Sequence, residues 1–303
     1  MTRPATAALF AAACAATGVT SGCQQRALQE ARARTVELEQ ALRPTFFATA
    51  LRKMGGGHFH GTTRFAVTPP GEAPDPVTTT TDVWIDRAGN YRMTELNDHD
   101  GGRDIVLYGR ELAVALRYGK MIRRVAEEPE PTRLLEEALG GPWAGWEVIA
   151  DAAAIERAAP QLIGGASAVE YRLSKGDGPA ITATATATDR PPLRKWRGTV
   201  AIQTLAGSLL VDERSGALVK ADLQATFTLT QETRALQGEI EVHSVVSEAA
   251  AVPAIERPAA EEMALRQRLV PEQKELLSGL GGHVPPPTPP PPVVKKKKKG
   301  ARP

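Results

Sequence analysis

The chain has 303 residues, of which 42% are hydrophobic and 24% are charged, a globular composition with room for one large domain or two modest ones. It contains only two cysteines, Cys14 and Cys23, which excludes a disulfide framework and a cysteine-rich zinc site. Beyond the amino-terminal segment there is no apolar run of the roughly 18 residues that a membrane-spanning helix needs, which excludes a polytopic membrane protein.

The formal net charge of +2 conceals an acidic body. Six cations lie within the last nine residues, as Lys295–Lys299 and Arg302, so the rest of the chain is mildly acidic. A nucleic-acid-binding body needs a basic face of its own. We therefore expect no nucleic-acid partner.

A targeting segment is predicted at residues 1–22. One arginine precedes an Ala-rich apolar stretch at 5–19, which is typical of a secretory signal and too short for a transmembrane helix. The sequence Thr20-Ser21-Gly22-Cys23 resembles the lipobox of bacterial lipoproteins, in which Cys23 is the site of lipid attachment and becomes the first mature residue. The alternative is an ordinary secreted protein in which Cys23 is incidental. By the same resemblance, Gln24 favours the periplasmic face of the outer membrane, with the acyl chains as a stable anchor.

Two helices are predicted at the start of the mature chain. Residues 23–43 are predicted to form a tether helix, because Leu38 and Leu42 continue a helical spacing of apolar residues among charged ones. Pro44 interrupts this helix, and the apolar residues 46–54 form a second, short helix that ends at three glycines. We expect this second helix to be buried against a sheet.

Most of the chain from residue 58 to 248 is predicted to be strand, because apolar residues recur there with a period of two. The predicted strands form two groups, 58–67, 78–86, 90–96, 105–108, 111–118 and 121–125, and then 169–173, 196–205, 208–211, 218–230 and 235–246. Between the groups we predict a helix at 132–139, an apolar connection containing Trp143 and Trp146, and a short helix at 152–159. Neighbouring strands on short turns pair antiparallel, which predicts an α+β fold with one antiparallel sheet of about nine to eleven strands.

The alternation ends after residue 248. Residues 249–280 are predicted to be a linker and a short helix, and 281–303 a disordered tail rich in proline and lysine. Within the tail, Pro285–Pro292 forms a polyproline II spacer about 25 Å long. Its lysines either contact an anionic envelope polymer or lipid head groups, or merely keep the chain end soluble. These candidate contacts are Lys295, Lys296, Lys297, Lys298 and Lys299.

The order of helix, strands, helical interruption and further strands behind a lipobox resembles the LolA/LolB-like superfamily. This superfamily includes outer-membrane lipoprotein carriers and receptors and the mycobacterial LppX/LprG lipoproteins. The resemblance covers residues 44–248. It is carried by Phe46-Phe47, by the hairpin Val83-Trp84-Ile85-Asp86 / Asn90-Tyr91-Arg92-Met93, and by the turn Gly109-Arg110-Glu111-Leu112.

The resemblance implies a strongly curved half-barrel with lid helices over an apolar cavity, which holds the acyl chain of a lipid or of a lipoprotein. A bent sheet exposes an apolar hollow that helices or a ligand must fill. The candidate cavity and lid residues are Phe46, Phe47, Leu51, Val83, Ile85, Tyr91, Met93, Leu112, Leu116, Trp143, Trp146, Phe227 and Leu229. For each of them, the sequence favours plain core packing over contact with a ligand.

We therefore expect a non-enzymatic, lipid-anchored envelope lipoprotein that binds a lipid or acyl chain. The alternative is a structural or interaction lipoprotein with a filled core, which contacts the cell wall or other envelope partners through its tail. No cofactor or metal is expected, because His58 and His60 share a strand face without a third ligand nearby. The sequence has no nucleophile-elbow, zinc-protease or P-loop motif.

Overall fold

The computed structural model describes residues 26, 29–163, 166–176, 199–231, 233–249 and 251–264. Residues 1–23, with the predicted signal and lipid-attachment cysteine, and the 281–303 tail lie outside the described residues. The compact unit ends at Ala264.

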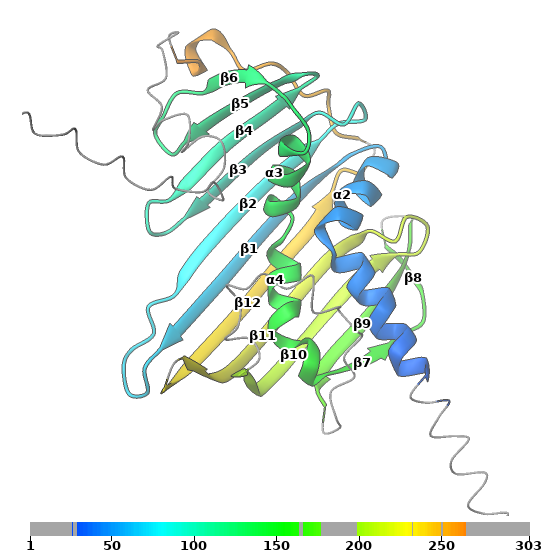
Figure 1. Ribbon diagram of the computed structural model, residues 1–303. Helices are drawn as coiled ribbons and strands as arrows, with labels where there is room; N and C mark the ends of the chain where they lie inside the picture. The colour runs from blue at the N-terminus through cyan, green and yellow to red at the C-terminus, as the bar shows by residue number, and fades with distance from the viewer. Residues whose placement is uncertain are drawn as a thin grey trace, which may run out of the picture. The chain divides into compact units, whose positions relative to one another are not determined.

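The described residues form one antiparallel sheet of twelve strands (Figure 1). Their order is β6-β5-β4-β3-β2-β1-β12-β11-β10-β9-β7, with β8 paired to β9, so the sheet is open and its edges are β6 and β7. This confirms the predicted α+β class and the incomplete barrel. The strands are β1 (Gly57–Thr68), β2 (Val77–Ile85), β3 (Tyr91–Asn97), β4 (Gly102–Tyr108), β5 (Glu111–Leu116), β6 (Ile122–Val125), β7 (Ala153–Arg157), β8 (Gln161–Ile163), β9 (Ala166–Lys175), β10 (Ala201–Asp212), β11 (Leu218–Gln231) and β12 (Arg234–Ser247).

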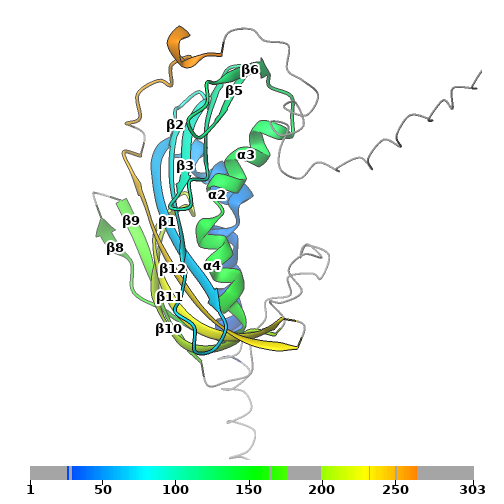
Figure 2. The same ribbon diagram turned by 90° about the vertical axis from the view of Figure 1, so that its left-hand side faces the viewer.

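The topology explains why helices cover one face of the sheet. Strands β1–β6 and β7–β12 are two sequential groups, and β12 returns to pair with β1 from His58↔Ser247 to Thr68↔Gln237. The chain must therefore pass from the β6 edge to the β7 edge. It does so as α3 (Glu130–Ala138) and α4 (Gly141–Ile149), which lie in the hollow of the curved sheet (Figure 2). We call this helix-covered side the concave face.

Two further helices, 29–42 and α2 (Pro44–Lys53), also pack on the sheet. The segment assigned to a tether from the sequence is in contact with the compact unit, since Leu38 and Leu42 are at most 1% exposed. Glu37 on the same helix is 3.8 Å from the Arg157 guanidinium of β7. None of the described helices is long and apolar enough to cross a bilayer.

Side-chain alternation on the strands places the main core on the concave face. On β11, Leu223, Phe227 and Leu229 are buried, whereas Gln224 between them is exposed. Two glycines leave room for aromatic rings: Phe59 lies over Gly61 of its own strand, and Phe227 lies over Gly238 of β12. A Cβ at Gly238 would sit 2.2 Å from that ring.

Three predicted elements differ in the structure. Residues 152–159 were expected to be helical, but Ala153–Arg157 is strand β7, because it pairs with β9 after a short 3₁₀ turn at Ala150–Ala152. The predicted apolar connection around Trp143 and Trp146 is helical. It forms α4, whose first turn contains a proline, a residue that is favoured at this position of a helix. The predicted strands 196–205 and 208–211 are one strand, β10, over the described residues.

Residues 251–264, assigned to a linker from the sequence, pack on the face opposite the helices, which we call the convex face. Ile255 and Met263 join a second, smaller cluster of buried residues on β4, β5 and the residue before β6. The Ile255 N–H donates to a carboxylate oxygen of Asp86 at 3.0 Å, and Met263 forms a parallel bridge to Met121. The β4–β6 end of the sheet is therefore covered on both faces.

Candidate functional site: the helix-covered concave face

The strand register brings most predicted wall residues together. Val83 of β2 faces Met93 of β3, and Ile85 faces Tyr91 in the same pair of strands. Each of these side chains is at most 1% exposed on the concave face, as is Leu112 on β5. They form one half of the apolar wall.

Three other predicted wall residues lie farther along the sheet. Phe227 and Leu229 are buried on β11, in the second half of the wall. Leu116 differs, because it is 44% exposed at the end of β5, opposite Arg103. Leu116 therefore marks the rim of the concave face and is not enclosed by it.

The predicted lid residues divide into an enclosed and a peripheral set. Phe47 and Leu51 of α2 are buried, and the Phe47 ring meets the Phe59 ring edge-on at 5.7 Å. Phe46 and Trp143 are only half-buried: Phe46 lies against Gly216 in the β10–β11 turn, and Trp143 lies 5.8 Å beneath the guanidinium of Arg43.

Helix α4 approaches the sheet through two glycines one turn apart. A Cβ at Gly145 would lie 2.8 Å from a methyl group of Val242 on β12, and one at Gly141 would lie 2.9 Å from the hydroxyl of Thr63 on β1. Trp146 is 1% exposed, and its indole N–H has no hydrogen-bond partner among the described residues. Sequence reasoning placed Trp146 in the lid but missed the helix, although the spacing Gly141–Gly145 is a signal of close helix packing.

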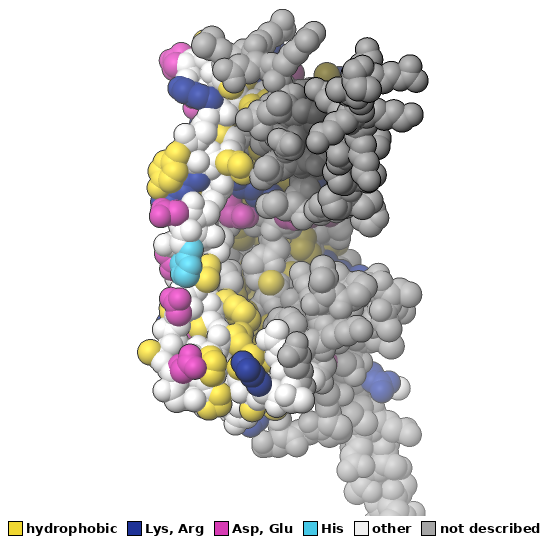
Figure 3. Space-filling view, turned by 60° about the vertical axis from the view of Figure 1, so that its left-hand side comes forward, with side chains coloured by type: hydrophobic (Ala, Val, Ile, Leu, Met, Phe, Trp, Pro, Cys, Tyr) yellow, Lys and Arg dark blue, Asp and Glu magenta, His cyan; other side chains and the backbone are white. Residues whose placement is uncertain are grey.

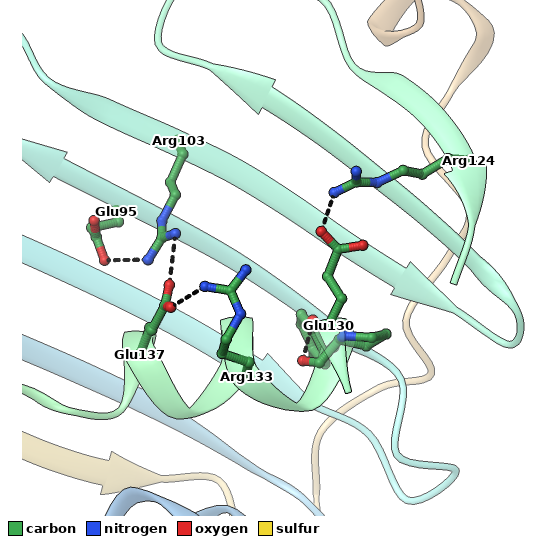
Figure 4. Close-up of polar contacts among 8 residues, drawn as sticks. Glu95, Arg103, Arg124, Glu130, Arg133 and Glu137 are labelled. Atoms are coloured by element: carbon green, nitrogen blue, oxygen red, sulfur yellow. Dashed lines mark hydrogen bonds and ion pairs between the residues drawn. The ribbon is translucent and has the colours of Figure 1, made fainter. Parts of the chain in front are cut away.

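Helix α3 buries Leu134, Leu135 and Ala138, and polar groups also join it to the sheet (Figure 4). Arg103 of β4 binds Glu137 of α3 at 3.2 Å and Glu95 of β3 at 3.3 Å. Arg124 binds Glu130, at the start of α3, at 2.6 Å. Side chains of two strands, β4 and β6, thus bind this helix by ion pairs, which water weakens wherever it reaches them.

A buried hydrogen bond adds to this attachment. The Tyr91 hydroxyl donates to the Pro131 carbonyl at 2.8 Å. Burial raises the pKa of the Tyr91 phenol well above its usual range, so it remains a donor at every physiological pH. The roof over the concave face therefore consists of α3, which combines apolar packing with ion pairs, and of α4, which approaches the sheet closely through its two glycines.

Two cavities adjoin the described sheet. One, of about 120 Å³, lies between helix 29–42 and strands β9 and β10, with Phe46 and Tyr171 in its lining. Burial, followed by a hydrogen bond with Glu37, raises the pKa of Tyr171 to about 12. The second, of about 290 Å³, is lined by alternate residues of the convex face. The wall and lid residues themselves are packed against one another.

The convex face holds a histidine cluster whose pairing the sequence analysis did not predict. His58 and His60 both contact the Asp82 carboxylate, at 3.0 and 2.9 Å, and His58 stacks on Trp84 with ring centroids 3.6 Å apart. Burial raises the pKa of Asp82, but the hydrogen bonds with His60 and His58 outweigh it and hold that pKa below its usual value. Ser247 is 3.3 Å from His58, on an exposed strand surface outside both cavities.

Charges elsewhere on the sheet are also paired, either across strands or along one strand. Arg64 contacts Glu239 at 2.6 Å, and Lys220 contacts Asp222 at 2.6 Å. On the face seen in Figure 3, acidic, basic and hydrophobic side chains are interspersed. Within the part of the chain that the structure describes, no group of three or more His, Cys, Asp or Glu side chains could hold a metal ion.

Comparison with known proteins gives matches of fold. No protein-family model matches the sequence, and no curated protein matches it. Among solved structures, the lipoprotein LppX of Mycobacterium tuberculosis is 12% identical, with a TM-score of 0.29 over 74% of this chain and 98% of that one. LprF of Mycobacterium bovis is 14% identical, with a TM-score of 0.28 over 72% and 97% of the two chains. A LolA superfamily protein of Nitrosomonas europaea is 9% identical, with a TM-score of 0.21 over 66% and 91%.

The arrangement implied by the resemblance to the LolA/LolB-like superfamily is present in this chain. The sheet is open and curved, and the helices between β6 and β7 lie over its concave face. At the TM-scores above we infer nothing about ligands from the matches, and we base the function below on this chain's own residues.

Proposed function

We propose that this chain is a non-enzymatic lipoprotein of the bacterial envelope that binds an acyl chain between its concave face and helices α2–α4. The observation that carries the proposal is the continuous apolar wall from Val83 to Phe227, roofed by short helices with no second sheet over it. Burying an alkyl chain gains about 0.8 kcal/mol per CH₂ group. A chain of about a dozen carbons would thus gain enough to displace side chains of the roof.

The roof has a part that can yield. Helix α3 buries Leu134 and Leu135. Its polar contacts to the sheet are the pairs of Arg103 with Glu137 and of Arg124 with Glu130, whose side chains are all partly exposed to water. Such pairs contribute roughly 1 kcal/mol or less each. Helix α4 makes the denser contact, through Gly145 and Trp146. Entry of an acyl chain would therefore begin with movement of α3, followed by separation of α4 from β12.

The anchor and the tail complete the proposal. Lipid attachment at Cys23 would leave only two residues before Arg26, which is helical and lies 3.2 Å from Glu30. The binding unit would then work beside its membrane and could not cross the periplasm. The lysines at 295–299 would contact anionic head groups or wall polymer of the same envelope.

Fluorescence quenching by brominated acyl chains tests the site. Trp146 lies in the roof, whereas Trp84 lies on the convex face and stacks on His58, so the two indoles are a matched pair. We expect brominated fatty-acyl lipid to quench the native chain, W146F to lose most of this quenching, and W84F to retain it. Native mass spectrometry should find about one lipid per chain. Equal quenching in native, W146F and W84F proteins would contradict a site beneath α4.

The second candidate is a structural or interaction lipoprotein whose core is filled by its own side chains. The observation that favours it is the dense packing of the wall, where Val83, Ile85, Tyr91 and Leu51 are fully buried. This candidate predicts a lipid-free protein after gentle extraction, and hydrogen exchange in α4 as slow as in β12. Deletion of residues 285–303 would then release the protein from the cell wall, whereas the acyl-chain proposal expects deletion to leave lipid binding unchanged.

A further inference from the structure

The convex face has a roofed groove on the side of the sheet opposite the proposed acyl-chain site; of the named wall residues, Phe227 alone also lies in its lining. Its floor is made by β1, β12, β11 and β10, and residues 69–76 between β1 and β2 return over it with Glu72 and Pro74 in the lining. Ala66 and Thr68 are buried beneath this loop, although other residues on the same face of β1, such as His60, are exposed. The groove has a volume of about 290 Å³, near the lower limit of small-molecule sites.

The register of the paired strands places neutral hydrogen-bonding side chains along the floor of the groove. Thr68 faces Gln237, which in turn faces Thr228, so the three form a row across β1, β12 and β11. Gln203 and Thr226 belong to the same lining. Since side chains directly opposite one another share a sheet face, all these hydroxyl and amide groups project from the convex side.

A strand irregularity contributes one of these groups. The β10–β11 register shifts between Ile202 and Thr204, so Gln203 lies at a bulge. Bulges re-aim a side chain out of the regular alternation and are frequent next to binding sites. The Gln203 amide donates long contacts of 3.4 Å to the Thr228 hydroxyl and to the Ala201 carbonyl, which a ligand group can replace. Thr204 and Thr226 fix the neighbouring position by a hydroxyl–hydroxyl bond of 2.7 Å.

The charges of the groove exclude an anionic ligand. The described lining contains no lysine or arginine, and its two ionisable groups are Glu72 and Glu239. Glu239 is already paired with Arg64 at 2.6 Å. A phosphate, a sulfate or a fatty-acid carboxylate would meet only the Arg64 cation, which Glu239 already neutralises, and would be repelled by Glu72. The exposed surface of the groove is more apolar than polar, but an alkyl chain would still cover the hydroxyl, amide or carboxylate groups of seven lining residues, and the cost of desolvating them disfavours it.

The backbone of the groove excludes a peptide bound as an added strand. β1, β12, β11 and β10 are interior strands, each paired on both sides, so they have no free edge to offer a peptide. A ligand must be recognised by side-chain hydroxyl, amide and carboxylate groups alone. We propose that this groove binds a neutral, polyhydroxylated ligand: one or two sugar units of an uncharged glycan.

Saturation-transfer NMR on the full chain tests the proposal with N,N′-diacetylchitobiose and maltose as neutral probes and a glucuronate disaccharide as the anionic comparison. We expect at least one neutral probe to bind with a Kd of about 1 mM or tighter, the affinity to be insensitive to added salt, and the glucuronate to give no transfer. Absence of transfer from both neutral probes, or preference for the glucuronate, would overturn the assignment.

Variants locate the binding. Gln203→Ala with Gln237→Ala should weaken the neutral probe about tenfold or more by removing two amides. Gln224→Ala is the matched control, because Gln224 projects from the same exposed face of β11 but lies outside the groove. If the double variant is less stable, Gln237→Ala alone serves, since that side chain is exposed. Equal loss of binding in the Gln224→Ala protein, or none in either amide variant, would contradict the groove.

Discussion

The contact of Gly145 with the sheet predicts that the smallest enlargement of α4 destabilises the protein. In Gly145→Ala, the new Cβ would lie 2.8 Å from the Val242 methyl and 3.4 Å from a methyl of Leu223. Val242 is β-branched and stiff about χ1, so it cannot easily turn away. Overpacking of this kind destabilises by about 1–3 kcal/mol. Replacing a helical glycine by alanine offsets about 1 kcal/mol of that.

The net expectation is a loss of about 1 kcal/mol in the free energy of unfolding, or about 2–4 °C in Tm for a domain of this size. Urea denaturation followed by circular dichroism measures it. The contact itself is tested by repeating the substitution in a Val242→Ala background, where the obstructing methyl groups are absent. There Gly145→Ala should become stabilising, by about 1 kcal/mol. The same change in stability in both backgrounds would refute the reasoning, because the helix–sheet contact would then not be the cause.

Three further predictions concern the roof and the convex face. Trp146→Ala should lower the free energy of unfolding by about 3–5 kcal/mol. Trp146→Phe should lower it far less, because this change also removes a buried N–H with no described partner. Equal losses of stability for the two variants in urea denaturation would contradict this. Arg103→Gln breaks the ion pair with Glu137 and should lower the free energy of unfolding by about 1 kcal/mol. Hydrogen exchange should become faster in α3 but not in β12. Unchanged exchange in α3 would show that this ion pair does not attach the helix. Hydrogen bonds, of which the one with Asp222 has the largest effect, raise the pKa of His243. The contribution of the protonated His243 to the free energy of unfolding should therefore be complete below a pH of about 6.5 and should decrease as the pH rises through the raised pKa. The stability difference between native protein and H243Q, less than about 1 kcal/mol at this exposed site, should therefore shrink from pH 6 toward alkaline pH, and a difference that grows would refute the sign.

Local sequence chemistry was sufficient for the hairpins. Asp at the first position and Gly at the fourth position of Asp86–Gly89 favour a type I turn between β2 and β3, and in the structure the Gly89 N–H donates to the Asp86 carbonyl at 3.0 Å. Gly89 has a φ of +84°, a conformation that glycine adopts without strain. The alternation of Leu223, Phe227 and Leu229 likewise predicted the buried face of β11.

Local chemistry was insufficient where packing overrides propensity. Ala153–Arg157 contains helix-favouring residues yet is a strand, because β9 has a free side with which it pairs. Helix α4 contains Gly145 and begins at Gly141, both unfavourable in a helix by about 1 kcal/mol. Its helical state is favoured by burial of Trp146 against the sheet, which no window of the sequence reveals.

The candidate site divides in the same way. The alternation identified Val83, Tyr91 and Phe227 as residues of one apolar face. It could not predict the groove on the convex face, because the floor of that groove forms only when β1 and β10 lie on either side of β11 and β12. The lid residues were recognised as apolar from the sequence. The attachment of helix α3 through Arg103 was not predicted, because a charged residue on a strand is expected to be exposed to solvent.

By itself, the sequence determined the strand periodicity, the hairpin turns and the apolar face of each strand, because these depend on neighbours a few residues apart. Only the tertiary structure decided that β12 closes against β1, that the connection from β6 to β7 crosses the hollow of the sheet, and that residues 251–264 cover the other face. The physical reason is that a period of two tells which side of a strand is buried and carries no information about which strand lies beside it.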